Sequence, residues 1–245
     1  MKETLIVIPA RYASTRFPGK VLAPLYGKPI LQWVYEACIK ADLGEVLIAT
    51  EHQAVVDGAA KFGAKAVLTS ASCASGTDRV YEVAKNRKEP FVVNVQSDEP
   101  FIQTATLVKA IDRLRKPDSD IATAGAPITN PDEVNDPNCV KIAMTPEGRA
   151  LYFSRAQIPF HHPLSPDSKK LPWYKHCGLY CYKRQALENF VKLPPSPLER
   201  LERLEQLRAL EAGMRITCVT VDRLGPAIDV PEDIARAQAY FEKNK

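Results

Sequence analysis

The sequence contains no long hydrophobic run. None of its 245 residues belongs to an apolar stretch of the ~18 residues that a membrane-spanning helix needs, so no insertion into a membrane is expected. The first apolar run follows Lys2 and Glu3, but it is short and ends at Pro9, which does not fit a secretory signal peptide. We therefore expect a cytoplasmic protein.

Basic residues are not gathered in a block either. Lysine and arginine number 33 against 29 aspartates and glutamates, which gives a net charge of +4, and the cations are spread along the chain. Proteins that bind nucleic acid typically carry a basic patch or stripe, so no nucleic acid is expected as a partner. The mild positive charge fits a small anionic substrate.

The familiar phosphate-binding fingerprints are also absent from the first loop. Gly19-Lys20 lacks the glycine five positions earlier that a Walker P-loop requires, and the loop has no Gly-x-Gly-x-x-Gly pattern. It does contain Arg11, Arg16 and Lys20 directly after an apolar run. Ligands of an open α/β sheet bind at the carboxyl ends of its strands. A loop with three cations at that position suits a polyphosphate.

Apolar runs alternate with helix-like segments through the first half of the chain. The expected strands are 4–8, 46–49, 64–68, 91–95 and 121–124. The expected helices between them are 30–41, 53–62, 77–86 and 104–114. This alternation predicts an α/β fold with a mostly parallel sheet and helices on both faces.

The pattern loosens after residue 126, where prolines separate short apolar pieces. Further strands are expected at 140–144, 151–153, 179–182 and 216–221. A polar, proline-containing loop is expected at 161–172. Leucines at helical spacing predict one helix over 197–212, with its leucine stripe in the core and Gly213 as its stop. A closing helix is expected over 231–241.

Two carboxylates stand next to expected elements of the sheet. Asp98 follows the strand 91–95, and Asp229 precedes the closing helix. Mg²⁺ prefers oxygen ligands and often keeps substrate phosphates in its shell, so we expect Asp98 to hold it. Asp98-Glu99-Pro100 would also suit a plain turn. Asp229 is either a second metal ligand or a neighbour of a helix cap, and the residue types leave both possibilities open.

The start of the helix expected at 77–86 carries a further polar group. Ser75 and Thr77 are residue types that cap helices. A helix N-terminus also binds anions, because its free N–H groups point outward. The segment is therefore either a cap alone or a cap that also contacts a nucleotide.

Several ordered motifs carry a more specific resemblance. The first are 8–20 (IPARYASTRFPGK), 75–79 (SGTDR) and 94–100 (NVQSDEP). Later ones are 150–159, 176–180, 195–199, 204–208 and 229–233. Together they resemble the bacterial CMP-KDO synthetases, which are 3-deoxy-manno-octulosonate cytidylyltransferases. The likeness runs from residue 4 to about 240, so it covers nearly the whole chain.

The resemblance implies a fold and a reaction. The family fold is a Rossmann-like three-layer α/β/α nucleotide-diphospho-sugar transferase fold with a small sheet insertion. It would form a single domain over 1–245, with the insertion at about 127–195 serving the sugar pocket and a homodimer. The implied reaction uses Mg²⁺ to transfer CMP from CTP to KDO, an acidic eight-carbon sugar. The products are CMP-KDO, which enters lipopolysaccharide biosynthesis, and pyrophosphate.

The resemblance also implies roles for individual residues. Asp98 and Asp229 would hold Mg²⁺, and with Arg11 and Lys20 they would be the catalytic residues. CTP would be bound by Ala10, Arg11, Arg16, Lys20, Ser75, Thr77 and Arg79. KDO would be bound by Gln96, Arg155, His176, Tyr180, Glu205 and Gln206.

Two departures and two alternatives accompany this hypothesis. Ser97 stands where the family has a glycine, and Ala227 replaces a glycine or serine near Asp229. The acceptor could be another 2-keto acid sugar such as sialic acid, although the sugar-pocket matches favour KDO. The chain could also be a non-catalytic nucleotide-binding protein, but the presence of both Asp98 and Asp229 argues against that.

Overall fold

The computed structural model describes residues 2–13, 16–165 and 172–244. Two residues of the cationic loop, 14–15, and part of the expected polar loop, 166–171, lie outside the described residues. No helix in these described ranges combines the length and the apolar character that crossing a membrane requires.

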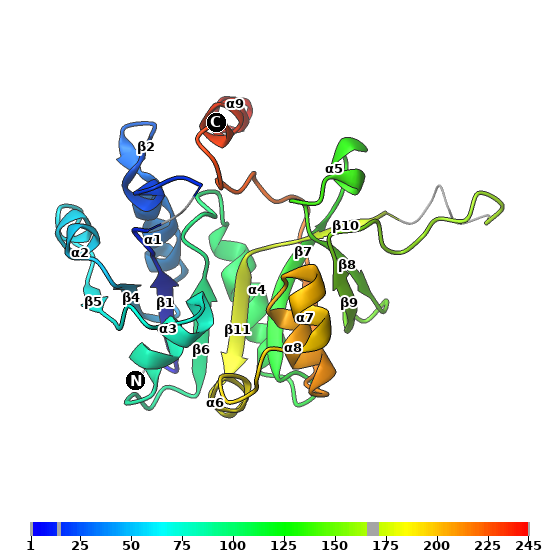
Figure 1. Cartoon of the computed structure of the whole chain (residues 1–245), viewed down its shortest axis with the longest axis horizontal. Coiled ribbons are helices and arrows are strands. Elements are labelled where there is room, and N and C mark those ends of the chain that lie inside the picture. The colour runs from blue at the N-terminus through cyan, green and yellow to red at the C-terminus, as the bar shows by residue number, and fades with distance from the viewer. Residues whose placement is uncertain (1, 14–15, 166–171, 245) are drawn as a thin grey trace.

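A large central sheet organises the molecule (Figure 1). In the described residues its order is β5-β4-β1-β6-β11-β7-β10-β8-β9, and β12 pairs with β7. The strand bounds are β1 Thr4–Pro9, β4 Gly44–Thr50, β5 Ala66–Leu68, β6 Phe91–Val95, β7 Ile121–Pro127, β8 Lys141–Met144, β9 Ala150–Ser154, β10 Tyr174–His176, β11 Leu179–Lys183 and β12 Ile216–Thr220. A separate small hairpin joins β2 (Pro24–Leu25) to β3 (Lys28–Pro29).

The strand directions confirm the predicted α/β class with a mostly parallel sheet. β5, β4, β1 and β6 pair in parallel, and β12 runs parallel to β7. β11 lies antiparallel between β6 and β7, and β10, β8 and β9 continue in antiparallel pairs. The carboxyl ends of β1, β4 and β6 therefore meet at one edge of the sheet, where the candidate residues of the first loop and of the Asp98 loop lie.

Helices cover both faces of the sheet and make the three layers (Figure 1). Along β1 the side chains alternate, so Ile6 and Ile8 enter one core while Leu5 and Val7 enter the other. The first core is closed by α1, α2 and α4, and the second by α3, α6 and α8. The helix bounds are α1 Ile30–Ala41, α2 Gln53–Ala60, α3 Gly76–Ala84, α4 Thr104–Leu114, α5 Asp132–Asn135, α6 Arg184–Phe190, α7 Pro197–Glu202, α8 Gln206–Glu211 and α9 Asp233–Lys243, with a 3₁₀ turn η1 at Lys20–Leu22.

The prediction of one continuous helix over 197–212 is wrong. The chain leaves the helical path at Arg203, which has φ 55°, so α7 ends and α8 begins three residues later. This backbone conformation costs a residue with a side chain ~1 kcal/mol or more. A buried ion pair between Glu199 and Arg208 ties the two helices together across the break. The leucine stripe is split as a result: Leu207 is buried, whereas Leu201 is 80% exposed.

The proposed insertion at 127–195 contains the antiparallel end of the sheet. β8, β9 and β10 lie there, and the described residues between β9 and β10, 155–165 and 172–173, project away from the body (Figure 1). Two large apolar side chains on that projection, Phe160 and Leu164, are 74% and 86% exposed. The role of this region in a homodimer remains a prediction.

Candidate active site

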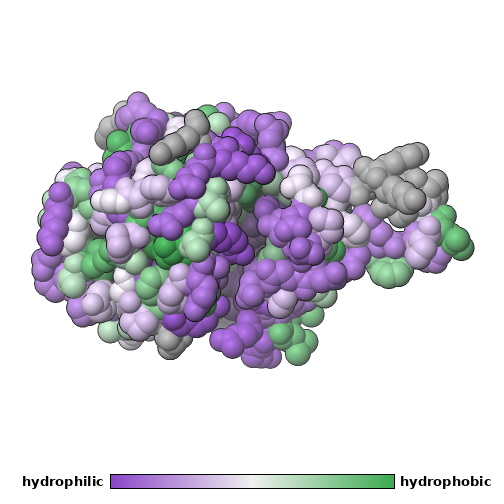
Figure 2. Space-filling view, turned by 90° about the horizontal axis from the view of Figure 1, so that it is seen from above, coloured by the Kyte–Doolittle hydropathy of each residue, from purple (hydrophilic) through white to green (hydrophobic). Residues whose placement is uncertain are grey.

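A polar cavity of about 410 Å³ opens above the carboxyl ends of β1 and β6. Seen from above, the surface is hollowed between two halves of the molecule, and hydrophilic side chains surround the hollow (Figure 2). The lining residues are Pro9, Arg11, Ala13, Arg16, Lys20, Val21, Ser75, Gly76, Gln96, Ser97, Asp98 and Asp229. The cavity therefore joins the first loop, the start of α3, the loop after β6 and the segment before α9.

The path of the first loop brings Lys20 into this cavity. Gly19 has φ 69°, a left-handed conformation that glycine adopts without strain, and its N–H donates to the Tyr12 carbonyl at 3.0 Å. The chain then turns into η1, whose first residue is Lys20. As a result the lysine side chain is buried, with 8% of the residue exposed.

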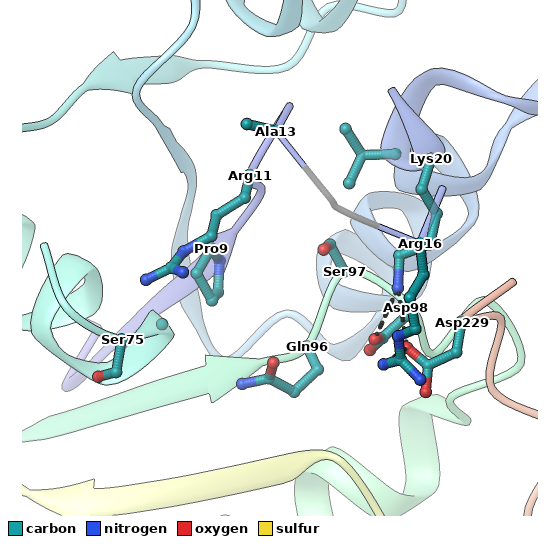
Figure 3. Close-up of a pocket in the computed structure, with 12 residues that line it drawn as sticks. Pro9, Arg11, Ala13, Arg16, Lys20, Ser75, Gln96, Ser97, Asp98 and Asp229 are labelled. Carbon is teal, nitrogen blue, oxygen red and sulfur yellow. Dashed lines mark hydrogen bonds and ion pairs between the residues drawn. The ribbon is translucent and has the colours of Figure 1, made fainter. Parts of the chain in front are cut away.

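Lys20 holds two carboxylates together at one side of the cavity (Figure 3). Its Nζ lies 3.0 Å from Asp98 Oδ2 and 3.3 Å from Asp229 Oδ1. Arg16 Nη2 approaches the same Asp229 oxygen at 3.3 Å, but both of these side chains are more than one-third exposed. The buried ammonium is thus balanced by negative charge on two sides, which offsets the cost of removing it from water.

Backbone contacts fix the two carboxylates beside each other. The N–H of Ile228 donates to the Asp98 carbonyl at 3.0 Å. The Asp233 carboxylate accepts from the N–H groups of Asp229 and Val230 at 2.7 and 3.1 Å, which sets the turn before α9. Main-chain hydrogen bonds therefore hold Asp98 and Asp229 next to each other, although they are far apart in sequence.

This pair of carboxylates fits a magnesium ion. Asp98 and Asp229 already hold one cation, the Lys20 ammonium, between them. Among the described residues, no group of three or more His, Cys, Asp or Glu side chains is arranged to hold a metal. A site built from two carboxylates suits Mg²⁺, because this ion keeps several waters and takes its remaining ligands from substrate phosphates.

The opposite side of the cavity carries Arg11 and Ser75 (Figure 3). Arg11 Nη2 donates to the Cys73 carbonyl at 3.0 Å, so the guanidinium is turned toward the segment that leads into α3. Ser75 caps α3: its Oγ accepts from the N–H of Asp78 at 3.1 Å, while the Asp78 carboxylate accepts from the Ser75 N–H at 2.9 Å. The two sides leave room for an extended anion between them.

Arg79 lies behind the cavity rather than in its lining. It is 1% exposed, and its Nη2 forms an ion pair with Glu51 Oε2 at 3.0 Å. Glu51 Oε1 in turn accepts from the N–H of Tyr12 at 2.9 Å. Ala10 is fully buried, and its N–H donates to the Ala49 carbonyl at 2.8 Å. In this structure Arg79 supports the first loop through Glu51, and its contact with cytidine stays a prediction.

A chain of hydrogen bonds leads from the cavity to α8. Gln96 Nε2 donates to Asn94 Oδ1 at 3.1 Å, and Asn94 Nδ2 donates to Thr77 Oγ1 at 3.4 Å. Thr77 Oγ1 donates to Glu205 Oε2 at 2.7 Å. Burial raises the pKa of Glu205, and the nearby hydroxyl groups partly oppose that change. The Nε2 atom of Gln206 is buried and has no hydrogen-bond partner among the described residues.

His176 and Tyr180 form an aromatic group at the junction of β10 and β11. Their ring centroids are 5.2 Å apart, and Phe153 packs edge-on against His176 at 5.1 Å. Thr123 Oγ1 donates to the Leu179 carbonyl at 2.6 Å, so it accepts from His176 Nε2 at 2.8 Å. Burial lowers the pKa of His176 to about 3, which keeps the imidazole neutral.

Arg155 occupies a different position from the cavity lining. Its Nε donates to the Glu202 carbonyl and its Nη1 to the Pro137 carbonyl, both at 2.8 Å. A guanidinium has five N–H donors, so three remain for a ligand.

Of the residues predicted from the sequence, the cavity lining brings together Arg11, Arg16, Lys20, Ser75, Gln96, Asp98 and Asp229. Outside that lining lie Ala10, Thr77, Arg79, Arg155, His176, Tyr180, Glu205 and Gln206.

Sequence reasoning gave no separate role to two glutamates that organise the site. Glu51 connects Arg79 to the first loop. Glu99 Oε1 accepts from the N–H of Gly178 at 2.7 Å, which joins the Asp98 loop to the strand end that carries His176. Burial, with a smaller effect of the neighbouring Asp98 charge, raises the pKa of Glu99 to about 7. Their one sequence signal is a carboxylate just beyond the carboxyl end of a strand.

Comparison with known proteins places the chain in a family. The family model described as cytidylyltransferase matches residues 5–216. The 3-deoxy-manno-octulosonate cytidylyltransferase of Elusimicrobium minutum is 53% identical over 246 residues, covering 100% of both chains. The 8-amino-3,8-dideoxy-manno-octulosonate cytidylyltransferase of Shewanella piezotolerans is 43% identical over 245 residues, covering 98% of each.

A solved structure agrees with these relatives. CMP:2-keto-3-deoxy-manno-octonic acid synthetase complexed with CTP superimposes with a TM-score of 0.90 at 37% identity. The match covers 99% of this chain and 100% of that one. The likeness thus extends over the whole fold, including the antiparallel end of the sheet. The chain belongs to the cytidylyltransferase family, and within it to the 3-deoxy-manno-octulosonate cytidylyltransferases, as its motifs predicted.

Proposed function

We propose that this protein transfers CMP from CTP to 3-deoxy-manno-octulosonate and releases pyrophosphate. The observation that carries the proposal is the buried Lys20 ammonium between Asp98 and Asp229, in a cavity that Arg11 and Arg16 also line. Cations on one loop can neutralise the phosphates of a nucleotide, while the carboxylates take a metal. The named relatives act on this sugar acid or on its 8-amino form.

The triphosphate lies along the first loop in this proposal. Arg11 and Lys20 contact its oxygens, with Arg16 close by. Asp98 and Asp229 would hold Mg²⁺, which would supply positive charge to the phosphates of the nucleotide. Lys20 pairs with both carboxylates and also lines the cavity. In this proposal its ammonium moves from the carboxylates to bind the phosphates.

The sugar supplies the nucleophile. Its anomeric hydroxyl attacks the α-phosphorus of CTP in line and gives its proton to solvent, the new P–O bond forms, and the bond to the β-phosphate oxygen breaks to release pyrophosphate. Transfer of this kind needs orientation and charge neutralisation more than covalent help from the protein. No side chain has to act as a nucleophile.

The two substrates occupy neighbouring parts of the site. The cytidine portion is bound by Ser75, Thr77 and Arg79 at the start of α3, together with the backbone at Ala10. The sugar acid is bound by Gln96, Arg155, His176, Tyr180, Glu205 and Gln206. The free donors of Arg155 suit a carboxylate, which a guanidinium holds through two parallel hydrogen bonds. Neutral His176, whose one N–H is donated to Thr123, accepts from a sugar hydroxyl group through Nδ1 without adding charge.

We further propose that the protein acts in the cytoplasm as a homodimer and supplies CMP-KDO for lipopolysaccharide biosynthesis. The exposed apolar projection that carries Phe160 and Leu164 supports an interface there. Size-exclusion chromatography with light scattering tests the dimer directly. A monomeric mass at micromolar concentration would contradict it.

Pyrophosphate release tests the reaction. The purified protein is incubated with CTP and Mg²⁺ and one of three acceptors: KDO, its 8-amino-8-deoxy form, or sialic acid. We expect turnover with KDO and little with sialic acid. Turnover with the 8-amino sugar alone would identify that compound as the acceptor. Turnover with sialic acid alone would contradict the proposal. CTP hydrolysis without any acceptor serves as the baseline.

A further inference from the structure

A second polar cluster lies next to Arg155, around the ammonium group of Lys141. This lysine is on β8 and is fully buried. Its Nζ donates to three backbone carbonyls, those of Asp136 at 2.8 Å, Cys139 at 2.6 Å and Arg155 at 2.6 Å. An ammonium has three N–H donors, so each finds one acceptor.

A buried cation with neutral partners is expensive to maintain. Burial lowers the pKa of Lys141, because the charged form loses its hydration. An apolar side chain at this position in the sheet would avoid that cost, but it would remove the Lys141 donor from three carbonyls, of which that of Asp136 would keep the Cys139 N–H at 3.2 Å. The lysine therefore fixes the main chain at 136, 139 and 155 in one arrangement.

The same segments fix the guanidinium of Arg155. The carbonyl of Pro137, which accepts from Arg155 Nη1, lies between Asp136 and Cys139, two of the three residues that Lys141 holds. The third residue is Arg155 itself. On the other side, the Glu202 carbonyl accepts from Arg155 Nε, and the Glu202 carboxylate accepts from the Arg155 N–H at 3.0 Å. Lys141 thus fixes the main chain of Arg155 through its carbonyl, and it fixes the segment whose Pro137 carbonyl accepts from Arg155 Nη1.

We propose that Lys141 is a positioning residue for the sugar acid, which orients the three free donors of Arg155 toward the substrate carboxylate without touching the substrate. The inference rests on the proposed function, since the contact of Arg155 with the sugar carboxylate comes from there. It adds a residue for which the sequence motifs gave no role.

Steady-state kinetics on Lys141→Met separates this role from a merely structural one. Pyrophosphate release gives KM for KDO and for CTP independently. We expect KM for KDO to rise about 10- to 100-fold, because a misplaced binding group loses most of its contribution. KM for CTP should change less than about twofold, because the lysine does not contact the nucleotide cavity. Lys183→Met is the matched control. Lys183 also donates to a carbonyl, that of Lys116, but it is the last residue of β11 and, within the described residues, makes no hydrogen bond or ion pair with Arg155.

Combining the change with Arg155→Ala shows whether the effect passes through Arg155. If it does, Lys141→Met adds little to the KM for KDO of the Arg155→Ala protein. Full additivity, or equal rises in KM for both substrates, would overturn the proposal. Lys141→Gln, which keeps two donors, gives the same comparison if the methionine variant does not fold. If Arg155→Ala leaves KM for KDO unchanged, the sugar role of Arg155 is wrong. If Arg155→Ala raises it and Lys141→Met does not, only the role of Lys141 is wrong.

Discussion

Replacing Lys20 with methionine should make the nucleotide-free protein bind Mg²⁺ more tightly. In the wild type, the Lys20 ammonium occupies the space between Asp98 and Asp229. A metal ion must displace it before the two carboxylates become ligands. Methionine keeps most of the side-chain volume but removes the competing charge. The same substitution should lower kcat about 100- to 1,000-fold, because the cation that we propose at the transferring phosphate is lost.

The size of the gain follows from the two contacts. The contact with Asp98 is at 3.0 Å between side chains that are 10% and 26% exposed. A hydrogen bond between charged groups of this kind is worth about 1.5 kcal/mol net. Asp229 is 40% exposed at 3.3 Å, so solvent screening reduces that contact to about 0.5 kcal/mol. Together they give about 2 kcal/mol, or roughly a 30-fold lower Kd for Mg²⁺.

Isothermal titration of Mg²⁺ into each protein without CTP measures this difference. Arg16→Met is the matched control, because Arg16 contacts the same Asp229 oxygen at 3.3 Å but is 58% exposed. Its Kd should change less than about twofold. Equal Mg²⁺ affinities of wild type and Lys20→Met would refute the argument that the lysine and the metal compete for one pair of carboxylates.

Three further changes test the surroundings of the site. Glu199→Ala removes the carboxylate 2.5 Å from the Arg208 guanidinium and leaves the more distant Glu205 Oε1 at 3.8 Å, so urea unfolding should show a loss of about 3 kcal/mol. The pKa of Glu99 is raised to about 7 in the folded state, so wild-type stability should fall as the pH rises from about 4.5 through 7, and thermal unfolding of Glu99→Gln should lose that dependence. Gly178→Ala would place a Cβ 2.9 Å from Glu99 Oε1 and 3.0 Å from Gln96 Cγ, so the KM values should rise with a stability loss of about 1–3 kcal/mol.

Each of these expectations has a contrary result. An unchanged urea midpoint in Glu199→Ala would mean that Arg208 finds another partner or water. A wild-type stability that rises between pH 5 and 7 with no difference from Glu99→Gln would mean that the carboxyl group ionises normally. Unaltered kinetics in Gly178→Ala would mean that the loop after β6 shifts without consequence for the substrates.

The sequence was sufficient for the parallel half of the fold, because local patterns decide it. The apolar run at 4–8 supplies side chains to two cores, and a continuous apolar run is what a strand buried on both faces requires. The residue pattern left open whether Asp229 shares a site with Asp98, and the family resemblance implied that it does. Their actual proximity depends on the hydrogen bond between Ile228 N–H and the Asp98 carbonyl, a long-range contact that residue types do not encode.

The break between α7 and α8 could not be predicted for a related reason. Arg203 has ordinary helix propensity, and neither glycine nor proline marks the position. What favours the break is tertiary: Glu199 pairs with Arg208 across it, and Glu205 reaches Thr77 on α3. The three-carbonyl environment of Lys141 is hidden in the same way, because its acceptors are main-chain atoms that every residue possesses.

The contact between Lys20 and Asp229 joins residues 209 positions apart in sequence, so the site that we propose is complete only when both ends of the chain have folded. We expect contacts between residues so far apart in sequence to form late, because closing the intervening loop costs conformational entropy before the contact stabilises the chain. Recovery of activity during refolding should therefore lag behind recovery of helical and sheet structure. In the proposed mechanism turnover requires Asp229, so activity would report the docking of the segment before α9. A chain that has formed its parallel sheet but not docked that segment would lack one of the two proposed metal ligands.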